Sequence, residues 1–301
     1  MHNSIRSFFI CFFFKTKLKI KLKINLNSIE EVSEEINSFE KFKSKKRKLS
    51  QGNRNISQLV SEDSNGYSFK TSDLEELLIK GIIDELICKI KSGKEASVYL
   101  GKADGEYLAV KIYTDLRVRS FRKDDVYRQG RFIGDARMEK AIDQGSERGL
   151  DAHQLLWVSE EFRQMNYLYN AGIPVPKPIA ISGLTILMEF IGTDGEAADR
   201  LSDIQLEKDE AEDAFRQSLR ILESIVSTGR IHGDYSAFNI LWHNGKAIVI
   251  DFPQIVSINS NIAAMELLHR DVVSLCKSFK RHRIQTDPDR IFRRLAGKID
   301  F

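Results

Sequence analysis

Residues 230–254 read RIHGDYSAFNILWHNGKAIVIDFPQ, and this stretch carries the strongest structural signal in the chain. An Asn-Gly pair at 244–245 separates two apolar runs, and such a pair is a strong signal for a two-residue hairpin turn. Asp234 and Asn239 precede the turn, and Asp251 ends the second apolar run. The stretch therefore predicts a hairpin with three polar side chains around it at fixed spacing.

The turn also determines which residues should face each other across the hairpin. Counting back from it pairs residue 243 with 246, 241 with 248 and 239 with 250, so Asn239 and Asp251 should arrive at the same open end. Two hard oxygen ligands in one place suit Mg²⁺. In an ideal pleat these two residues would point to opposite faces, so we expect the ladder to be distorted or finished at this end.

The spacing HGD-x4-N-x11-D is typical of phosphoryl-transfer sites in kinase-like folds. In such sites the first aspartate, here Asp234, takes the proton of the accepting hydroxyl, while Asn239 and Asp251 bind metal. His232 is expected to support the loop around Asp234 and not to act itself. A surface hairpin that ends in aspartate by chance is the alternative.

The composition separates the start of the chain from the rest. The 301 residues are 42% hydrophobic, enough to bury a full core in one two-lobed unit or two small domains. Residues 1–50 hold 12 of the 46 Lys and Arg but only 5 of the 43 Asp and Glu, so the remainder is mildly acidic despite the net charge of +3. The overall charge is therefore no evidence that residues 51–301 bind nucleic acid.

Residues 1–70 are predicted to form a basic and polar extension that is disordered. The apolar run at 8–14 has the length of a signal-peptide core, but almost no positive charge precedes it and no small-residue cleavage site follows. The KSKKRK run at 43–48 would suit an acidic nucleic acid or a localisation signal, or is simply solvated. Targeting, disorder and a wrongly assigned start stay open for residues 1–50.

The cysteines favour a reducing compartment. Cys11, Cys88 and Cys276 are few, odd in number and far apart, which indicates neither a disulfide framework nor a zinc site. No apolar run approaches the roughly 20 residues that a membrane-spanning helix needs. We therefore expect a cytoplasmic protein without a membrane partner.

The segment from residue 71 to 113 predicts helix, loop and strand in that order. Thr71 or Ser72 caps one or two short amphipathic helices that extend to Leu86 and Ile87. A small-residue loop at 91–97 then leads into a strand, and its backbone could approach phosphate oxygens. Lys111 lies inside the apolar strand 107–113, which is costly unless its charge is paired; an edge strand with a solvated lysine is the alternative.

A helix predicted over 151–171 supplies the partner for that lysine. It carries an apolar stripe and stops at Gly172, and Glu161 falls on its buried side. Lys111 is the obvious cation for this glutamate, as in the lysine–glutamate ion pair that kinases need. The segment 115–150 before the helix is long, charged and rich in glycine, so it is expected to be a flexible insert.

The remaining pattern predicts a second, mostly helical half. Residues 184–190 should form a buried strand, and 191–195 a crossover where two lobes join and an adenine edge could bond to backbone. Helices are expected over 207–228 and 266–281, the second with an apolar face that is core and not site.

With these residues laid out, the chain resembles the RIO family of atypical serine/threonine protein kinases. The resemblance covers roughly residues 72–283. In the segments LLWVSEEF and HRDVVSLCKSF the chain looks most like the bacterial-type branch of the family. Its motifs are, in order, GIIDELICKIKSGKEASVYLG, LAVKIY, YRQGRF, WVSEEF, GIPVPKPI, MEFIG, HGDYSAFNIL and VIDFPQIV. It implies an α+β, two-lobed protein-kinase-like fold. Residues 71–190 would form an N-terminal lobe with an antiparallel sheet plus a helix, and 191–301 a mostly helical C-terminal lobe.

The resemblance also implies a role for each site residue. Lys111 and Glu161 would form the ion pair, Asp234 would be the catalytic base, and Asn239 and Asp251 would hold Mg²⁺, with Mn²⁺ as an alternative. Asp251 could itself accept a transient phosphoryl group, giving ATPase behaviour. The ATP-binding residues would be Ser92, Gly93, Lys94, Glu95, Val98, Ala109, Lys111, Met188, Glu189, Ile191, Leu241 and Ile250, with the backbone of Glu189 and Ile191 at the adenine.

Two departures from ordinary kinases keep several functions open. Asp251-Phe252-Pro253 replaces Asp-Phe-Gly and no Ala-Pro-Glu follows, so the peptide-docking lobe is expected to be missing and ATP binding is better supported than protein phosphorylation. The first hypothesis is a Mg²⁺-dependent enzyme that moves the ATP γ-phosphoryl group to a Ser or Thr or to its own aspartate. The second is an ATP-gated factor that binds a ribosomal precursor particle or another ribonucleoprotein, with turnover serving only release. The third is a small-molecule phosphotransferase, against which SGKEASVY and DFPQ argue.

Overall fold

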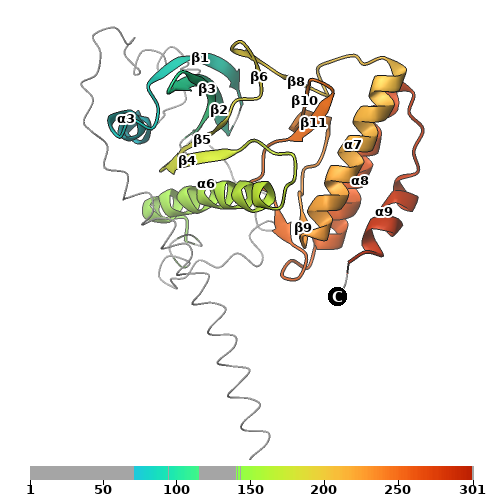
Figure 1. Cartoon of the computed structure of the whole chain (residues 1–301). Coiled ribbons are helices and arrows are strands. Elements are labelled where there is room, and N and C mark those ends of the chain that lie inside the picture. Colours follow the sequence, from blue (N-terminus) through green and yellow to red (C-terminus); the bar gives the residue numbers. More distant parts are fainter. Residues whose placement is uncertain (1–70, 94, 115–139, 141, 143, 300–301) are drawn as a thin grey trace, which may run out of the picture. The chain divides into compact units, whose positions relative to one another are not determined.

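The computed structural model describes residues 71–93, 95–114, 140, 142 and 144–299 (Figure 1). These residues belong to one compact unit, Lys48–Phe301. The predictions for residues 1–70, for Lys94 and for most of the insert at 115–150 lie outside them. No helix in the described ranges is long and apolar enough to cross a membrane.

The first half of the described chain is built on a five-stranded antiparallel sheet of order β1-β2-β3-β5-β4. Leucine, isoleucine, valine and tyrosine side chains of α3 and the sheet form one core cluster. The α3 helix is joined to the β4–β5 turn by Asp73, which accepts a hydrogen bond from Leu184 N at 2.9 Å. The elements are α3 (Thr71–Ile79), β1 (Glu85–Ser92), β2 (Ala96–Ala103), β3 (Glu106–Tyr113), β4 (Pro178–Ser182) and β5 (Thr185–Glu189).

One secondary-structure prediction in this half is wrong. Leu86 and Ile87 belong to strand β1 and not to a helix. The chain leaves α3 through Gly81, whose φ of +68° is a left-handed conformation that glycine adopts without steric cost. Because β1 is an edge strand with two register shifts against β2, its apolar residues do not alternate regularly and mimic a helical period.

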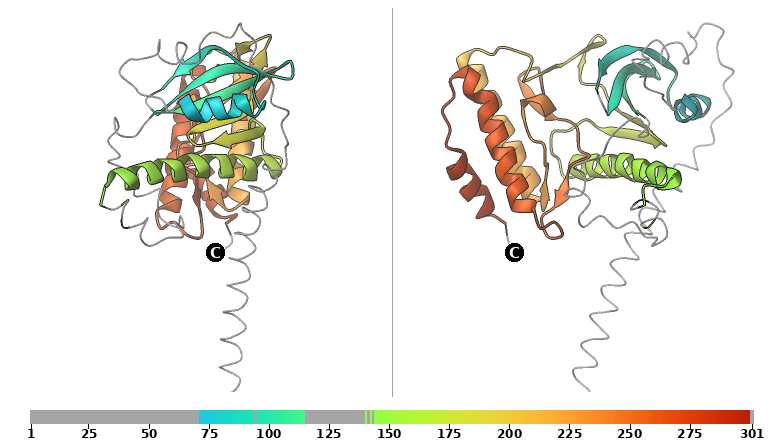
Figure 2. Two further views of the ribbon diagram at one scale, coloured as in Figure 1. Left: turned by 90° about the vertical axis from the view of Figure 1, so that its left-hand side faces the viewer. Right: turned by 180° about the vertical axis from the view of Figure 1, so that it is seen from behind.

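Helix α6 (Glu147–Asn170) lies along the sheet next to β4 and β5 (Figure 2). It starts four residues before the predicted position because Ser146 caps it and accepts a hydrogen bond from Gly149 N at 3.1 Å. The predicted insert therefore ends at this cap. The predicted buried face of the helix is confirmed, and Glu161 lies on it.

The second half is mainly helical, as predicted. Helices α7 (Lys208–Ser227) and α8 (Ala264–Phe279) pack together, and α9 (Pro288–Ala296) packs on α8 (Figure 1). Their apolar faces join the larger core cluster. The predicted hairpin is present as β10 (Ile240–His243) and β11 (Lys246–Val249), and the predicted pairs 243 with 246 and 241 with 248 are confirmed. The short elements are β6 (Gly192–Thr193), β7 (Glu196–Ala197), β8 (Asp199–Arg200), β9 (Arg230–Ile231), η2 (Ala237–Asn239), β12 (Val256–Ser257) and η3 (Lys280–His282).

Candidate active site

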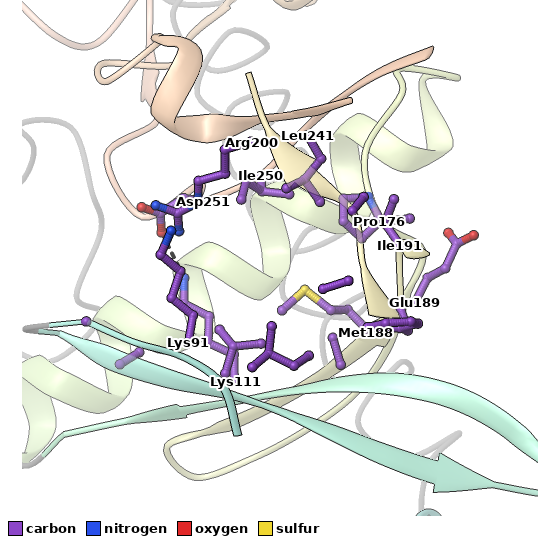
Figure 3. A pocket seen from close by; sticks show the side chains of 18 of the residues that line it. Lys91, Lys111, Pro176, Met188, Glu189, Ile191, Arg200, Leu241, Ile250 and Asp251 are labelled. Atoms are coloured by element: carbon purple, nitrogen blue, oxygen red, sulfur yellow. Dashed lines mark hydrogen bonds and ion pairs between the residues drawn. The ribbon is translucent and has the colours of Figure 1, made fainter. Parts of the chain in front are cut away.

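A cavity of about 640 Å³ lies between the sheet and the hairpin (Figure 3). Strands β1, β2, β3 and β5 line one side, and β8 together with the end of the hairpin lines the other. All the predicted ATP-binding residues that the structure describes line it. They are Ser92, Gly93, Glu95, Val98, Ala109, Lys111, Met188, Glu189, Ile191, Leu241 and Ile250.

One end of the cavity is apolar. Ala109 faces Met188 across the β3–β5 ladder, and Leu241 and Ile250 close the opposite wall. Past β5, the backbone carbonyl of Ile191 accepts a hydrogen bond from Ala198 N at 2.9 Å. Among the described residues no acceptor bonds the N–H of Ile191, so this donor is available to a ligand. An apolar slot with a backbone donor at its edge suits a flat heterocyclic base.

The other end of the cavity holds the predicted ion pair. Lys111 Nζ lies 2.7 Å from Glu161 Oε1 and 2.8 Å from Asp251 Oδ1. These contacts join strand β3, helix α6 and the residue after the hairpin, three places far apart in the sequence. The alternative of a solvated Lys111 on an edge strand is therefore wrong, since β3 is the central strand and Lys111 is buried.

Burial and charge set opposite protonation tendencies in this cluster. Burial raises the pKa of Glu161 to about 6, although the charge of Lys111 works against that rise. Burial also acts to raise the pKa of Asp251, but the charge and hydrogen bond of Lys111 outweigh it, so this pKa is lowered. Burial acts to lower the pKa of Lys111, and the two carboxylates reverse that effect and raise it. Lys111 therefore stays a cation and Asp251 a carboxylate at neutral pH.

The hairpin ladder ends where the metal ligands are predicted. Asn239 belongs to the 3-10 turn η2, and its carbonyl accepts a hydrogen bond from Ile250 N at 3.0 Å, one pair beyond the ladder. Asp251 has a φ of +72°, a left-handed conformation that is uncommon for a residue with a side chain. The expected distortion is confirmed, because both residues leave the regular pleat.

Asp234 and Asn239 form a second pair beside this end. Asn239 Nδ2 donates to the backbone carbonyl of Asp234 at 2.9 Å and to its Oδ2 at 3.0 Å. Burial raises the pKa of Asp234, the hydrogen bond from Asn239 opposes that rise, and the charge of Asp251 adds to it. A raised pKa suits a proton acceptor. Neither residue lines the cavity itself, so the structure groups them with the loop and not with the cavity wall.

The sequence did not reveal what holds this loop. Asp271 on α8 accepts hydrogen bonds from Gly233 N at 2.8 Å and Tyr235 N at 2.9 Å, on either side of Asp234. The available signal was an aspartate on the apolar face of a predicted helix, the same signal that identified Glu161. His232 is fully buried, and its ring packs edge-on against Tyr235 and Phe252, which confirms its predicted supporting role.

The donor set fits a divalent cation that also binds phosphate. Because Asn239 uses Nδ2 on Asp234, its Oδ1 is the atom left for a metal, and the side chain of Asp251 is 43% exposed. The described residues contain no cluster of three or more His, Cys, Asp or Glu that could hold an ion by themselves. Six carboxylates and three cations line the cavity, so a polyphosphate would need added cations to bind there.

Several lining residues were not predicted, since nothing in the sequence marks them. Strand β8 has two residues and is defined only by its pairing with β10. The lining residues that belong neither to the predicted loop, hinge and ion pair nor to the other predicted site residues are Ile90, Pro176, Ala197, Ala198, Asp199, Arg200, Asp203 and Phe252.

Comparisons with known proteins agree with this arrangement. The family model of the RIO domain matches residues 97–291. The human serine/threonine-protein kinase RIO1 is 33% identical over 214 residues, which are 70% of this chain but only 36% of that protein. The RIO-type serine/threonine-protein kinase Rio1 of Haloferax volcanii is 33% identical over 225 residues, covering 74% of this chain and 72% of the relative.

A solved structure agrees with the fold. The Rio2 kinase–ADP/Mg²⁺–phosphoaspartate complex from Chaetomium thermophilum aligns with a TM-score of 0.56 at 23% identity, over 81% of this chain and 74% of that chain. This likeness confirms the predicted two-lobed, kinase-like α+β architecture. The similarity to the bacterial-type branch stays a prediction. The family match, the two relatives and the shared architecture together show that this chain belongs to the RIO domain family.

Proposed function

We propose that this chain transfers the γ-phosphoryl group of ATP in a Mg²⁺-dependent reaction, as a RIO-type serine/threonine protein kinase, an ATPase, or both. The observation that carries the proposal is Lys111 held between Glu161 and Asp251 at one end of a cavity whose other end is apolar. A base at the apolar end would direct the phosphates toward this lysine. The names of the relatives and of the solved structure support the same activity.

Each residue has a role that its surroundings support. Lys111 is a fixed cation that offsets charge on the phosphate oxygens, and Glu161 keeps it in position. Asp234 accepts the proton of the attacking hydroxyl, for which its raised pKa suits it. Asp251 and the Oδ1 of Asn239 would hold Mg²⁺, or Mn²⁺ as an alternative, and the ion would neutralise phosphate charge.

A specific observation favours Asp251 as an acceptor in its own right. Its carboxylate is ionised, 43% exposed and at the cavity wall, so the oxygen that Lys111 does not bind can attack phosphorus. In that step the new O–P bond forms as the bond from the γ-phosphorus to the bridging oxygen breaks, and ADP leaves with the electron pair. Water then releases phosphate and restores Asp251. The phosphoaspartate named for the Chaetomium protein supports this route.

A second candidate function concerns what ATP hydrolysis would serve. If Asp251 is the main acceptor, nucleotide hydrolysis would serve to release a bound partner, and a ribosomal precursor particle is the predicted one. Protein substrates and autophosphorylation belong to the first candidate. Small-molecule transfer is the least supported of the three, and a cytoplasmic location stays a prediction from the cysteine pattern.

The test is to incubate the chain with γ-labelled ATP and Mg²⁺ and to map the label. We expect label on the chain or a protein substrate in the wild type and none in Asp234→Ala with a hydroxyl acceptor. Acid-stable phosphoserine or phosphothreonine would identify the kinase. A labile acyl phosphate that disappears in Asp251→Asn would identify the ATPase route, and absence of both label and ATP hydrolysis would refute the proposal.

A further inference from the structure

Arg200 lines the cavity and has no predicted role. It lies on strand β8, where it pairs with Leu241 of β10 on the same wall. Its side chain extends along that wall toward Asp251 (Figure 3). The position is therefore fixed by the ladder that also presents the hairpin to the cavity.

Among the described residues, the guanidinium of Arg200 differs from the other cations of the cavity in making no hydrogen bond or ion pair. Lys111 bonds to Glu161 and Asp251, and Lys91 forms an ion pair with Asp203 at 3.4 Å. Within the part of the chain that the structure describes, Arg200 makes no hydrogen bond or ion pair, although it is half-buried. A partly desolvated guanidinium has five donors to satisfy, so this site suits an incoming anion.

The place of Arg200 indicates which anion this is. Met188, Glu189 and Ile191 mark one side of the cavity, whereas Arg200 and Asp251 lie together on the other (Figure 3). Arg200 also interacts electrostatically with the carboxylates of Asp251 and Asp203, which agrees with this proximity. A ligand whose base lies at Met188 would present its phosphates to Arg200.

We propose that Arg200 binds the terminal phosphoryl group of ATP beside Asp251 and is a further catalytic residue of the transfer; this rests on the proposed function. The planar guanidinium can donate two parallel hydrogen bonds to one phosphate, which an ammonium group cannot match. During transfer the bond from the γ-phosphorus to the bridging oxygen breaks and the bond to the acceptor oxygen forms. Arg200 keeps its proton throughout and offsets the charge on the non-bridging oxygens.

Lys91 is a weaker candidate for the same role. Its side chain is 45% exposed, and its charge is already opposed by Asp203. An exposed pair of this kind is worth little and is screened by salt. Lys91 could move toward a ligand only by giving up this contact, whereas Arg200 gives up none among the described residues.

The experiment compares Arg200→Ala and Arg200→Lys with Arg216→Ala. Arg216 is an exposed arginine of α7 that pairs with Asp213 outside the cavity, so it serves as the matched control. Calorimetry with Mg²⁺ measures the affinity for ADP and for a non-hydrolysable ATP analogue, and single-turnover transfer is followed with γ-labelled ATP. A melting curve confirms folding. If the alanine variant does not fold, Arg200→Lys and Arg200→Gln take its place, and the ratio of the affinities for the ATP analogue and for ADP decides.

We expect Arg200→Ala to weaken binding of the ATP analogue about 10-fold or more, the worth of one charged hydrogen bond. Affinity for ADP should change by less than about twofold, because ADP lacks the phosphate that Arg200 binds. The transfer rate should fall on the order of 10²-fold, with partial recovery in Arg200→Lys and no change in Arg216→Ala.

Equal losses for ADP and the ATP analogue, or an unchanged ratio of the two affinities, would overturn the role of Arg200. Such a result in a wild type that still transfers phosphate would leave the proposed function intact. A wild type that binds no ATP would instead refute both.

Discussion

Replacing Glu161 by glutamine should separate activity from stability. The variant loses the charge of Glu161, whose Oε1 lies 2.7 Å from Lys111 Nζ, so the ion pair becomes a hydrogen bond from a charged donor to a neutral amide oxygen. It also removes a carboxylate that is only 1% exposed and whose pKa burial raises to about 6 from 4.5. This raised pKa already includes the opposing effect of Lys111, so at 1.36 kcal/mol per pKa unit the ionised carboxylate costs the folded wild type about 2 kcal/mol net above pH 6. Because glutamine is a neutral isostere, the variant should be as stable as the wild type at pH 7, or more stable by up to about 2 kcal/mol.

Activity should nevertheless fall. Among the described residues, Asp251 is then the only charged partner of Lys111, at 2.8 Å, so Lys111 is drawn away from the phosphates toward the predicted metal ligand. We expect the transfer rate to drop on the order of 10²-fold, the usual effect of disturbing one fixed charge in an active site. Urea unfolding and single-turnover transfer of γ-labelled phosphate measure the two quantities, with Glu160→Gln, one residue away on the same helix, as the control.

The stability difference between the wild type and Glu161→Gln should depend on pH in a known direction. The folded-state pKa of Glu161 is raised, so the unfolded chain releases this proton first, and wild-type stability falls relative to the variant as pH rises from 4.5 to 6. A variant less stable than the wild type by over about 3 kcal/mol would contradict this stability expectation, since that is the penalty for breaking a buried ion pair. A variant with full activity would refute the role of the ion pair.

Three further predictions test other parts of the site. Asp234→Ala should lower transfer to a hydroxyl by about 10²–10⁴-fold while ATP affinity stays within about twofold, and calorimetry that shows lost binding would point to misfolding instead. His232 is buried and its pKa is lowered to about 4 from 6.5, so its contribution to stability is lost as pH falls through that window. Unfolding curves should show the wild type losing about 3 kcal/mol of unfolding free energy relative to His232→Phe between pH 7 and pH 4. Parallel pH profiles of the two proteins would contradict this. Removing divalent cations with EDTA should abolish transfer and weaken ATP binding, because six carboxylates line the cavity; undiminished binding without metal would argue against a metal held at Asp251.

The residues that sequence reasoning found are those whose chemistry conflicts with their surroundings. A lysine inside an apolar strand and a glutamate on the apolar face of a helix each need a partner, and the structure pairs Lys111 with Glu161. The Asn-Gly turn set the hairpin register, which in turn brought Asn239 and Asp251 to one end. Such inferences work because an unpaired buried charge and a tight turn allow few solutions.

The residues that it missed depend on tertiary contacts with no local signature. Arg200 reaches the cavity only because a two-residue strand pairs with β10. Asp271 was hidden within a helix interpreted as core, although a buried aspartate there also needed a partner. Strand β1 was taken for a helix because bulges at an edge remove the regular alternation of a strand. In each case the pairing of distant segments decided the outcome.

The most direct test of the account is a crystal structure of the chain with Mn²⁺ and a non-hydrolysable ATP analogue. We predict an anomalous peak bound to Asp251 and to the Oδ1 of Asn239, at roughly the 2.0–2.3 Å expected for oxygen ligands of such an ion. The terminal phosphate should lie within hydrogen-bond distance of Lys111 and the base beside Met188. A metal peak away from both ligands, or a nucleotide outside this cavity, would contradict the central claim that these side chains surround a single triphosphate.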